Sequence, residues 1–175
     1  DLEKAGAQGI TVHPRPDERH ITRNDVTVLK DSISTEFNIE GYPDARYMEI
    51  VRDAHPTQAT LVPDSPTQLT SNAGWDVVNN KELLRGIVNE LKSLGVRVSI
   101  FVDPDERQVE ATHEVGADRV ELYTKPYADG YDSDRETAVA PYVKASRRAA
   151  ELGLGVNAGH DLDSHNLRFL AEKLP

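Results

Sequence analysis

A repeated local pattern organises the chain: a helix-like run, then an apolar residue, a glycine, another apolar residue and a short β-rich run. It occurs at Ala5-Gly6-Ala7, Leu94-Gly95-Val96, Val115-Gly116-Ala117 and Leu152-Gly153-Leu154. A glycine in this place is typical of the left-handed cap that ends a helix. The β-branched, apolar run that follows is typical of a buried parallel strand. The pattern therefore predicts a repeated unit of helix, glycine stop and strand.

The hydrophobic pattern predicts six strands alternating with helices. The strands are expected at 9–13, 36–40, 59–62, 97–102, 119–123 and 155–158. Thr22 and Asp25 resemble a capping box that opens a helix to about Ile33. Asp103 is expected to cap a further helix, with Pro104 in its first turn and its end near residue 115. The remaining helices are expected at 45–54, 77–94, 135–152 and 164–173.

This alternation predicts a parallel α/β sheet in one domain, residues 1–175, because no linker or low-complexity segment interrupts it. The pattern leaves open whether the sheet is doubly wound or closes into a barrel. No glycine-rich nucleotide fingerprint follows the first strand, which counts against a dinucleotide-binding sheet. Connections in such folds are usually short. The longer stretches 63–76 and 124–134 are therefore expected to be lids or substrate loops.

Composition narrows the function classes. The net charge of −10 disfavours nucleic acid and anionic membranes as partners, so any phosphate site must be locally basic. The chain has no cysteine, which excludes disulfides, cysteine nucleophiles and thiolate metal sites within it and fits a cytoplasmic protein. No apolar stretch is long enough to cross a bilayer.

The carboxyl ends of the strands carry the candidate chemistry, since active sites of parallel α/β folds lie there. Strand-end residues with polar or ionisable side chains are His13, Glu40, Asp103, Glu121, Asn157 and His160. Arg15, Arg19 and His20 form a basic cluster after the first strand, and arginine offers a planar fork for phosphate oxygens. A solvated loop would explain that cluster equally well; its position beside His13 favours anion binding.

Each candidate also has a plain structural interpretation. A single histidine after a strand is more often a surface residue than a catalyst. Glu40 is harder to dismiss, because a carboxylate on a buried strand must be paired or must shift its pKa. The histidines at 55, 113 and 165 are expected to be surface residues, and Lys125 a solvated loop lysine.

Several motifs, in order along the whole chain, resemble the pyridoxine 5′-phosphate synthase family. The segment from Gly9 to Ile21, GITVHPRPDERHI, is similar to the family's signature loop. Other similar segments are FNIE at 37–40, LVP at 61–63, LTSNAGWD at 69–76, VSIFVD at 98–103 and ELYT at 121–124. The most specific match is VNAGHDL at 156–162.

The resemblance implies a (β/α)₈ TIM barrel, usually assembled as a homo-octamer, of which about six βα units are present here. The family's first strand would precede Asp1 and its last strand would follow Pro175. Part of one substrate's site is then expected outside this span. The span by itself is expected to be poorly soluble or inactive, because an unclosed sheet exposes its edges.

The implied reaction joins 1-deoxy-D-xylulose 5-phosphate with 3-amino-2-oxopropyl phosphate to give pyridoxine 5′-phosphate, phosphate and water. The substrate supplies the amine, so no enzyme lysine is needed, and no metal or organic cofactor is implied. Repeated proton transfer needs groups that titrate near neutral pH. By resemblance, His13 and Glu40 accept protons, His160 donates one and Glu121 stabilises a cationic transition state. Arg15 and His20, helped by Thr70, would hold deoxyxylulose phosphate. Asp161 would also contact substrate, at a position that is Gly in some relatives.

Two alternatives stay open. A metal-dependent barrel hydrolase or isomerase could use His13, His20, Glu40 and His160 as ligands. Against it, the nearby arginines would repel a cation. A non-catalytic phosphometabolite-binding domain would explain Arg15 and His20, but it would give Glu40 and His160 no function.

Overall fold

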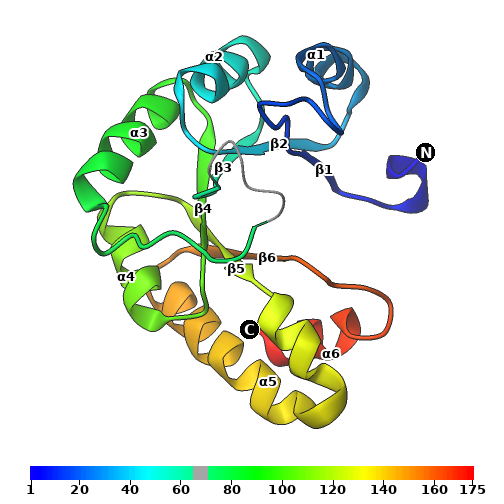
Figure 1. The fold of residues 1–175 in the computed structure, drawn as a ribbon, viewed down its shortest axis with the longest axis vertical. Helices are drawn as coiled ribbons and strands as arrows, with labels where there is room; N and C mark the ends of the chain where they lie inside the picture. Colours follow the sequence, from blue (N-terminus) through cyan, green and yellow to red (C-terminus); the bar gives the residue numbers. More distant parts are fainter. Residues whose placement is uncertain (65–70) are drawn as a thin grey trace.

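The chain forms a curled, entirely parallel sheet with helices around its outer face. A computed structural model describes residues 1–64 and 71–175, and all statements below concern these residues. Within them the sheet has six strands in the order β1-β2-β3-β4-β5-β6, so each strand pairs with its neighbours in sequence. Figure 1 shows the helices in an arc around the curved sheet. The fold is a partial (β/α)₈ barrel with six of its βα units in this chain.

The strands lie close to the ranges that the hydrophobic pattern predicts. They are β1 (Gly9–Val12), β2 (Glu36–Gly41), β3 (Gln58–Leu61), β4 (Arg97–Val102), β5 (Arg119–Tyr123) and β6 (Gly155–Gly159). The helices are η1 (Glu3–Ala5), α1 (Arg23–Ser32), α2 (Ala45–Ala54), α3 (Lys81–Ser93), α4 (Glu106–Glu114), α5 (Lys125–Glu151) and α6 (Leu167–Lys173). None of the helices in the described part is both long enough and apolar enough to cross a bilayer.

The predicted helix stops are confirmed in their backbone geometry. All four glycines of the repeated pattern have positive φ, from 75° at Gly153 to 103° at Gly6. Side chains disfavour this conformation because Cβ approaches the following carbonyl oxygen, and glycine has no Cβ. The Thr22–Asp25 capping box is also present, with each side chain accepting a hydrogen bond from the other residue's backbone N–H. Local sequence thus sets where these helices end or begin.

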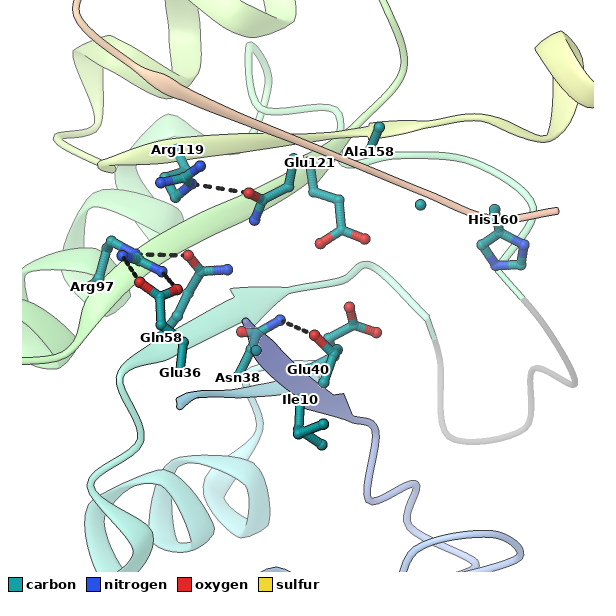
Figure 2. A pocket seen from close by; sticks show the side chains of 14 residues that line it. Ile10, Glu36, Asn38, Glu40, Gln58, Arg97, Arg119, Glu121, Ala158 and His160 are labelled. Atoms are coloured by element: carbon teal, nitrogen blue, oxygen red, sulfur yellow. Dashed lines mark hydrogen bonds and ion pairs between the residues drawn. The ribbon is translucent and has the colours of Figure 1, made fainter. Parts of the chain in front are cut away.

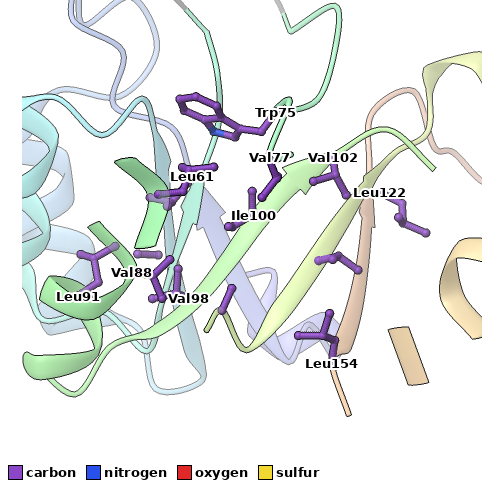
Figure 3. Packing of buried hydrophobic residues seen from close by; sticks show 14 of the residues in the cluster. Leu61, Trp75, Val77, Val88, Leu91, Val98, Ile100, Val102, Leu122 and Leu154 are labelled. Atoms are coloured by element: carbon purple, nitrogen blue, oxygen red, sulfur yellow. The ribbon is translucent and has the colours of Figure 1, made fainter. Parts of the chain in front are cut away.

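Alternation along the strands separates an apolar outer face from a polar inner face. On β4, Val98 and Ile100 are fully buried and pack in the core between sheet and helices (Figure 3). The same core receives Leu61, Val88 and Leu91. The intervening residues face the barrel interior, because successive strand residues point to opposite faces. The inner face is lined by polar side chains that include Glu36, Asn38, Glu40, Gln58, Arg97, Arg119, Glu121 and Asn157.

The predicted loop at 124–134 is wrong: it is the first part of α5, which runs from Lys125 to Glu151 with a kink at Asp134 (φ −159°, ψ 85°). The prediction rests on the length of this stretch. Pro126 does not prevent a helix here, because proline is tolerated in the first turn. Tyr127 is completely buried here and donates a hydrogen bond to the Asn166 carbonyl at 2.7 Å. Tertiary packing of this tyrosine therefore overrides the local loop signal.

Three predicted helix starts also need correction. Asp105, not Asp103, caps α4: its carboxylate accepts a hydrogen bond from the Arg107 backbone N–H. Asp103 instead accepts one from the Gly74 N–H at 3.3 Å, which ties the stretch before α3 to the end of β4. The helix expected from residue 77 begins at Lys81. The last helix begins at Leu167, after turns at 164–166.

Candidate active site

Six of the eight predicted site residues line one cavity at the carboxyl ends of the strands. The cavity has a volume of about 450 Å³, and the predicted residues on its wall are His13, Arg15, His20, Glu40, Glu121 and His160. A second cavity of about 550 Å³ lies in the barrel interior and shares Glu40, Glu121 and His160 with the first. Figure 2 shows Glu40 from β2 and Glu121 from β5 pointing toward one another across this space. The topology thus brings together residues up to 147 positions apart in the chain.

His13 and Glu40 form the closest pair of predicted proton-transfer groups. His13 Nδ1 lies 3.9 Å from Glu40 Oε2, and both side chains are about one-fifth exposed. Burial, together with the positive charge of Arg15, lowers the pKa of His13 to about 4. The imidazole is therefore neutral at pH 7, so the contact joins a neutral base to a carboxyl group and is not an ion pair there.

Both interior carboxyl groups hold protons more tightly than a free glutamate. Burial raises the pKa of Glu121 from 4.5 to about 7. Burial raises the pKa of Glu40 as well, and the negative charges of Glu121 and Asp64 add to that rise. Both effects disfavour the ionised form, because water is scarce and like charges are close. The site therefore places two groups where they can exchange protons near neutral pH.

Gly159 at the end of β6 makes room for the Glu121 carboxyl group. A Cβ atom at this position would lie 2.7 Å from Glu121 Oε1, which is closer than real side chains allow. The strand register explains the approach, since Tyr123 on β5 is paired with Gly159 and Glu121 with Asn157. Glycine is needed here for space, not for an unusual backbone conformation.

His160 enters the site on a strained turn. His160 and Asp161 have φ values of 96° and 58°, in the left-handed region that non-glycine residues rarely adopt. Thr124 Oγ1 donates to the carbonyl oxygens of Gly159 and His160, at 2.5 and 2.6 Å, and holds the turn. The imidazole packs edge-on against the ring of Tyr123, with centroids 5.2 Å apart. Backbone strain of this kind is found at functional sites, where surrounding contacts maintain it.

The loop after β1 is built to present Arg15 toward the cavity. Arg46 of α2 donates hydrogen bonds to the Pro14 carbonyl at 2.8 Å and to Glu18 Oε1 at 2.9 Å. Arg15 Nη2 lies 3.2 Å from Asp64 Oδ2. Arg19, the third member of the predicted basic cluster, pairs with Asp17 at 2.6 Å and is not among the cavity residues. The cluster is therefore split: Arg15 and His20 line the cavity, and Arg19 belongs to a loop ion pair.

The other two predicted site residues are Asp161 and Thr70. Asp161 is exposed beside His160, and its Oδ2 lies 3.1 Å from His160 Nδ1. Thr70 lies outside the described residues. Sequence reasoning missed Asp64, a carboxylate of which only 2% of the side chain is exposed. Its signal was available: Asp64 is the first charged residue after the third strand.

The histidines set aside as surface residues, His55, His113 and His165, are exposed as predicted. Within residues 1–64 and 71–175, no group of three or more His, Asp or Glu side chains has the geometry to hold a metal ion.

Comparison with known proteins shows the family. Residues 1–175 match the family described as "Pyridoxal phosphate biosynthesis protein PdxJ". A pyridoxine 5′-phosphate synthase from Porphyromonas gingivalis is 55% identical over 175 residues, which is all of this chain and 74% of that protein. One from Parabacteroides distasonis is 54% identical over the same shares.

Solved structures support the fold alone. The crystal structure of the Amycolatopsis orientalis BexX/CysO complex contains a chain similar to this one, with a TM-score of 0.53 and 19% sequence identity. The similarity covers 98% of this chain and 79% of that chain. The family match over the whole chain and the sequence relatives show that this chain belongs to the PdxJ family of pyridoxal phosphate biosynthesis proteins.

Proposed function

We propose that this pyridoxine 5′-phosphate synthase condenses 3-amino-2-oxopropyl phosphate with 1-deoxy-D-xylulose 5-phosphate in the cavity at the carboxyl ends of the strands. One observation carries the proposal: a neutral imidazole, two carboxyl groups with raised pKa and an arginine line the same cavity. The reaction forms an imine, removes water and phosphate, and closes a ring. Each stage moves a proton to or from carbon, nitrogen or oxygen.

His13 and Glu40 are the proton acceptors in this proposal. A base must be unprotonated at working pH, and a pKa of about 4 keeps His13 in that form. The raised pKa of Glu40 makes its carboxylate a stronger base than an ordinary glutamate and lets it hold a proton between steps. The 3.9 Å between the two side chains allows one substrate to contact both. Their different pKa values suit successive transfers at different atoms.

Glu121 and His160 complete the acid–base set. A carboxyl group with a pKa of about 7 ionises readily when a cationic intermediate forms next to it. Glu121 would therefore gain negative charge when the transition state gains positive charge. His160 directly follows the carboxyl end of β6, where it would return a proton to a departing oxygen. This division assigns each ionisable group on the cavity wall a separate step.

Phosphate binding would fall to the loop after β1. Arg15 and His20 line the cavity on the same side as His13, and a guanidinium binds phosphate oxygens through planar N–H pairs. Thr70, which lies outside the described residues, would assist them. The other substrate would meet the turn at Asp161, whose left-handed backbone suits a contact through the main chain. The substrates' reacting ends would then meet between Glu40 and Glu121.

The direct test is mass-spectrometric detection of pyridoxine 5′-phosphate from the full-length protein supplied with both substrates. We expect product from the wild type and at least about a hundredfold less from His160→Ala, the scale of a lost acid–base group. His113→Ala, an exposed helical histidine, is the matched control and should keep wild-type turnover. A folded, substrate-supplied wild type that makes no product would refute the proposed reaction.

Two further measurements separate this function from the alternatives. Glu40→Gln should abolish turnover while keeping the circular dichroism spectrum; unchanged turnover would favour a phosphometabolite-binding domain. Activity should also survive extensive dialysis against a chelator. If activity requires stoichiometric zinc or manganese, the hypothesis of a metal-dependent hydrolase or isomerase would be favoured instead.

The family resemblance also supports a homo-octamer in the cytoplasm. Light scattering coupled to size-exclusion chromatography of the full-length protein tests the assembly, and cell fractionation tests the location.

A further inference from the structure

Asp64 is a buried carboxylate next to the proposed phosphate-binding arginine. It follows β3 by three residues, and only 2% of its side chain is exposed. Asp64 Oδ2 accepts hydrogen bonds from Arg15 Nη2 at 3.2 Å and from Ser71 Oγ at 2.6 Å. The Ser71 carbonyl in turn accepts from the Tyr123 hydroxyl at 3.2 Å. One carboxylate therefore joins the loop after β1 to the segment after β3, which is itself tied to the end of β5.

This buried arrangement of Asp64 is poorly suited to stabilising the fold. Asp64 Oδ1 is buried and has no hydrogen-bond partner among the described residues. Removing a carboxylate from water costs several kcal/mol in general, and a buried ion pair repays that only when its remaining acceptors are satisfied. A surface ion pair such as Arg23–Asp53, whose side chains are 44% and 64% exposed, avoids that cost. The burial of Asp64 is therefore better explained by its hydrogen bond to Arg15, which holds the guanidinium in place.

Arginine has a flexible side chain, and fixing it in advance lowers the cost of binding an anion. Each rotamer-rich side chain that a ligand must immobilise costs about 0.5–1.5 kcal/mol of affinity. The Arg15 side chain is held at 14% exposure beside Asp64, on the same cavity wall as His13. The bond to Asp64 involves Nη2 of the guanidinium, a planar group whose geometry suits phosphate oxygens.

We propose that Asp64 is a positioning residue that holds the Arg15 guanidinium in the orientation that binds the phosphate of deoxyxylulose phosphate. The proposal rests on the proposed function of Arg15 and goes beyond it, because Asp64 touches neither substrate in this scheme. It also accounts for Ser71, whose hydroxyl donates to the same Asp64 oxygen that Arg15 contacts.

The charge of Asp64 has a second effect that agrees with this role. Arg15 lowers the pKa of both His13 and Glu40, and Asp64 raises both. An arginine positioned without Asp64 would thus weaken Glu40 as a base. Asp64 offsets that effect while it orients the guanidinium.

The test is steady-state kinetics of the full-length protein with Asp64→Ala, Arg15→Ala and the double variant. Asp64→Ala should raise KM for deoxyxylulose phosphate roughly tenfold, equal to about 1.4 kcal/mol. Its kcat should stay within about threefold of wild type, and KM for 3-amino-2-oxopropyl phosphate should not change. In the Arg15→Ala background the same substitution should change KM less than about twofold, because a positioning residue acts only through its partner. Asp53→Ala, which removes one of the two exposed carboxylate partners of Arg23, is the matched control and should leave both KM values unchanged.

The outcomes distinguish this proposal from the assignment of Arg15. If Arg15→Ala leaves KM for deoxyxylulose phosphate unchanged, the role of Arg15 itself is wrong. If Arg15→Ala raises that KM but Asp64→Ala leaves it unchanged or lowers it, the positioning role of Asp64 is refuted. Full additivity in the double variant would also refute it. Should Asp64→Ala not fold, Asp64→Asn keeps the size of the side chain, and it should raise the same KM about threefold.

Discussion

Replacing Glu121 with glutamine should stabilise the folded protein while it damages the site. Burial raises the pKa of Glu121 from 4.5 to about 7. Each pKa unit is worth about 1.4 kcal/mol, so ionised Glu121 destabilises the fold by about 3 kcal/mol. Glutamine keeps the shape of the protonated side chain and removes this charge. At pH 8 we therefore expect the free energy of unfolding of Glu121→Gln to exceed that of wild type by about 2–3 kcal/mol.

The sign of the pH dependence follows from the direction of the pKa shift. Below about pH 4.5, Glu121 is protonated in the folded and the unfolded chain, so it costs nothing. Between pH 4.5 and 7 the unfolded chain releases the proton first, and the stability of the wild type falls as the pH rises. Above pH 7 both states are ionised and the full cost is present. The advantage of Glu121→Gln should therefore grow from near zero at pH 4.5 to its maximum above pH 7.

Urea denaturation of the full-length protein at pH 5, 6, 7 and 8, followed by circular dichroism, measures this difference. Protein concentration must be fixed, since assembly contributes to apparent stability. Glu82→Gln is the matched control: its side chain is 91% exposed, and its stability should stay within about 0.5 kcal/mol of wild type at every pH. A Glu121→Gln protein that is no more stable than wild type at pH 8 would refute the reasoning. So would an advantage that does not shrink toward pH 5.

Three further predictions follow from the geometry. Gly159→Ala should reduce turnover at least about tenfold, because the new Cβ would lie 2.7 Å from Glu121 Oε1 and would push the carboxyl group out of position. Gly86→Ala is the control and should keep wild-type turnover, because its Cβ would have no neighbour within 4 Å. Equal kinetics for the two variants would contradict the close approach. Asp161→Gly should keep turnover within about threefold. It should also raise the free energy of unfolding by about 0.5 kcal/mol, because glycine adopts the left-handed backbone at φ 58° without strain; thermal unfolding would measure this gain. The 175-residue chain expressed alone should self-associate in light scattering, because β1 and β6 end the described sheet and each exposes an edge; a monodisperse, active protein would show otherwise.

The alternation of helix, glycine stop and strand was enough to predict all six strands and their parallel arrangement. Local chemistry decides these features: a glycine ends a helix wherever the backbone must turn left-handed, and β-branched runs favour extended chain. Sequence reasoning failed at 124–134, where the length of the stretch between the fifth strand and the expected helix predicted a loop. Burial of Tyr127 against the chain near Asn166 makes that segment helical, and the residues involved are about forty positions apart.

The sequence by itself also determined which residues could do chemistry, because the strand-end rule selects His13, Glu40, Glu121 and His160 before any distance is known. The resemblance to a family then assigned them roles. Only the tertiary structure decided how these groups differ from one another. A pKa depends on burial and on charges brought near by folding, so the neutral imidazole of His13 and the raised pKa of Glu121 have no local sequence signal. The strand-end position of Asp64 was visible in the sequence, but its contact was not: the bond to Arg15 spans 49 positions and exists only because β1 and β3 end at the same edge of the sheet.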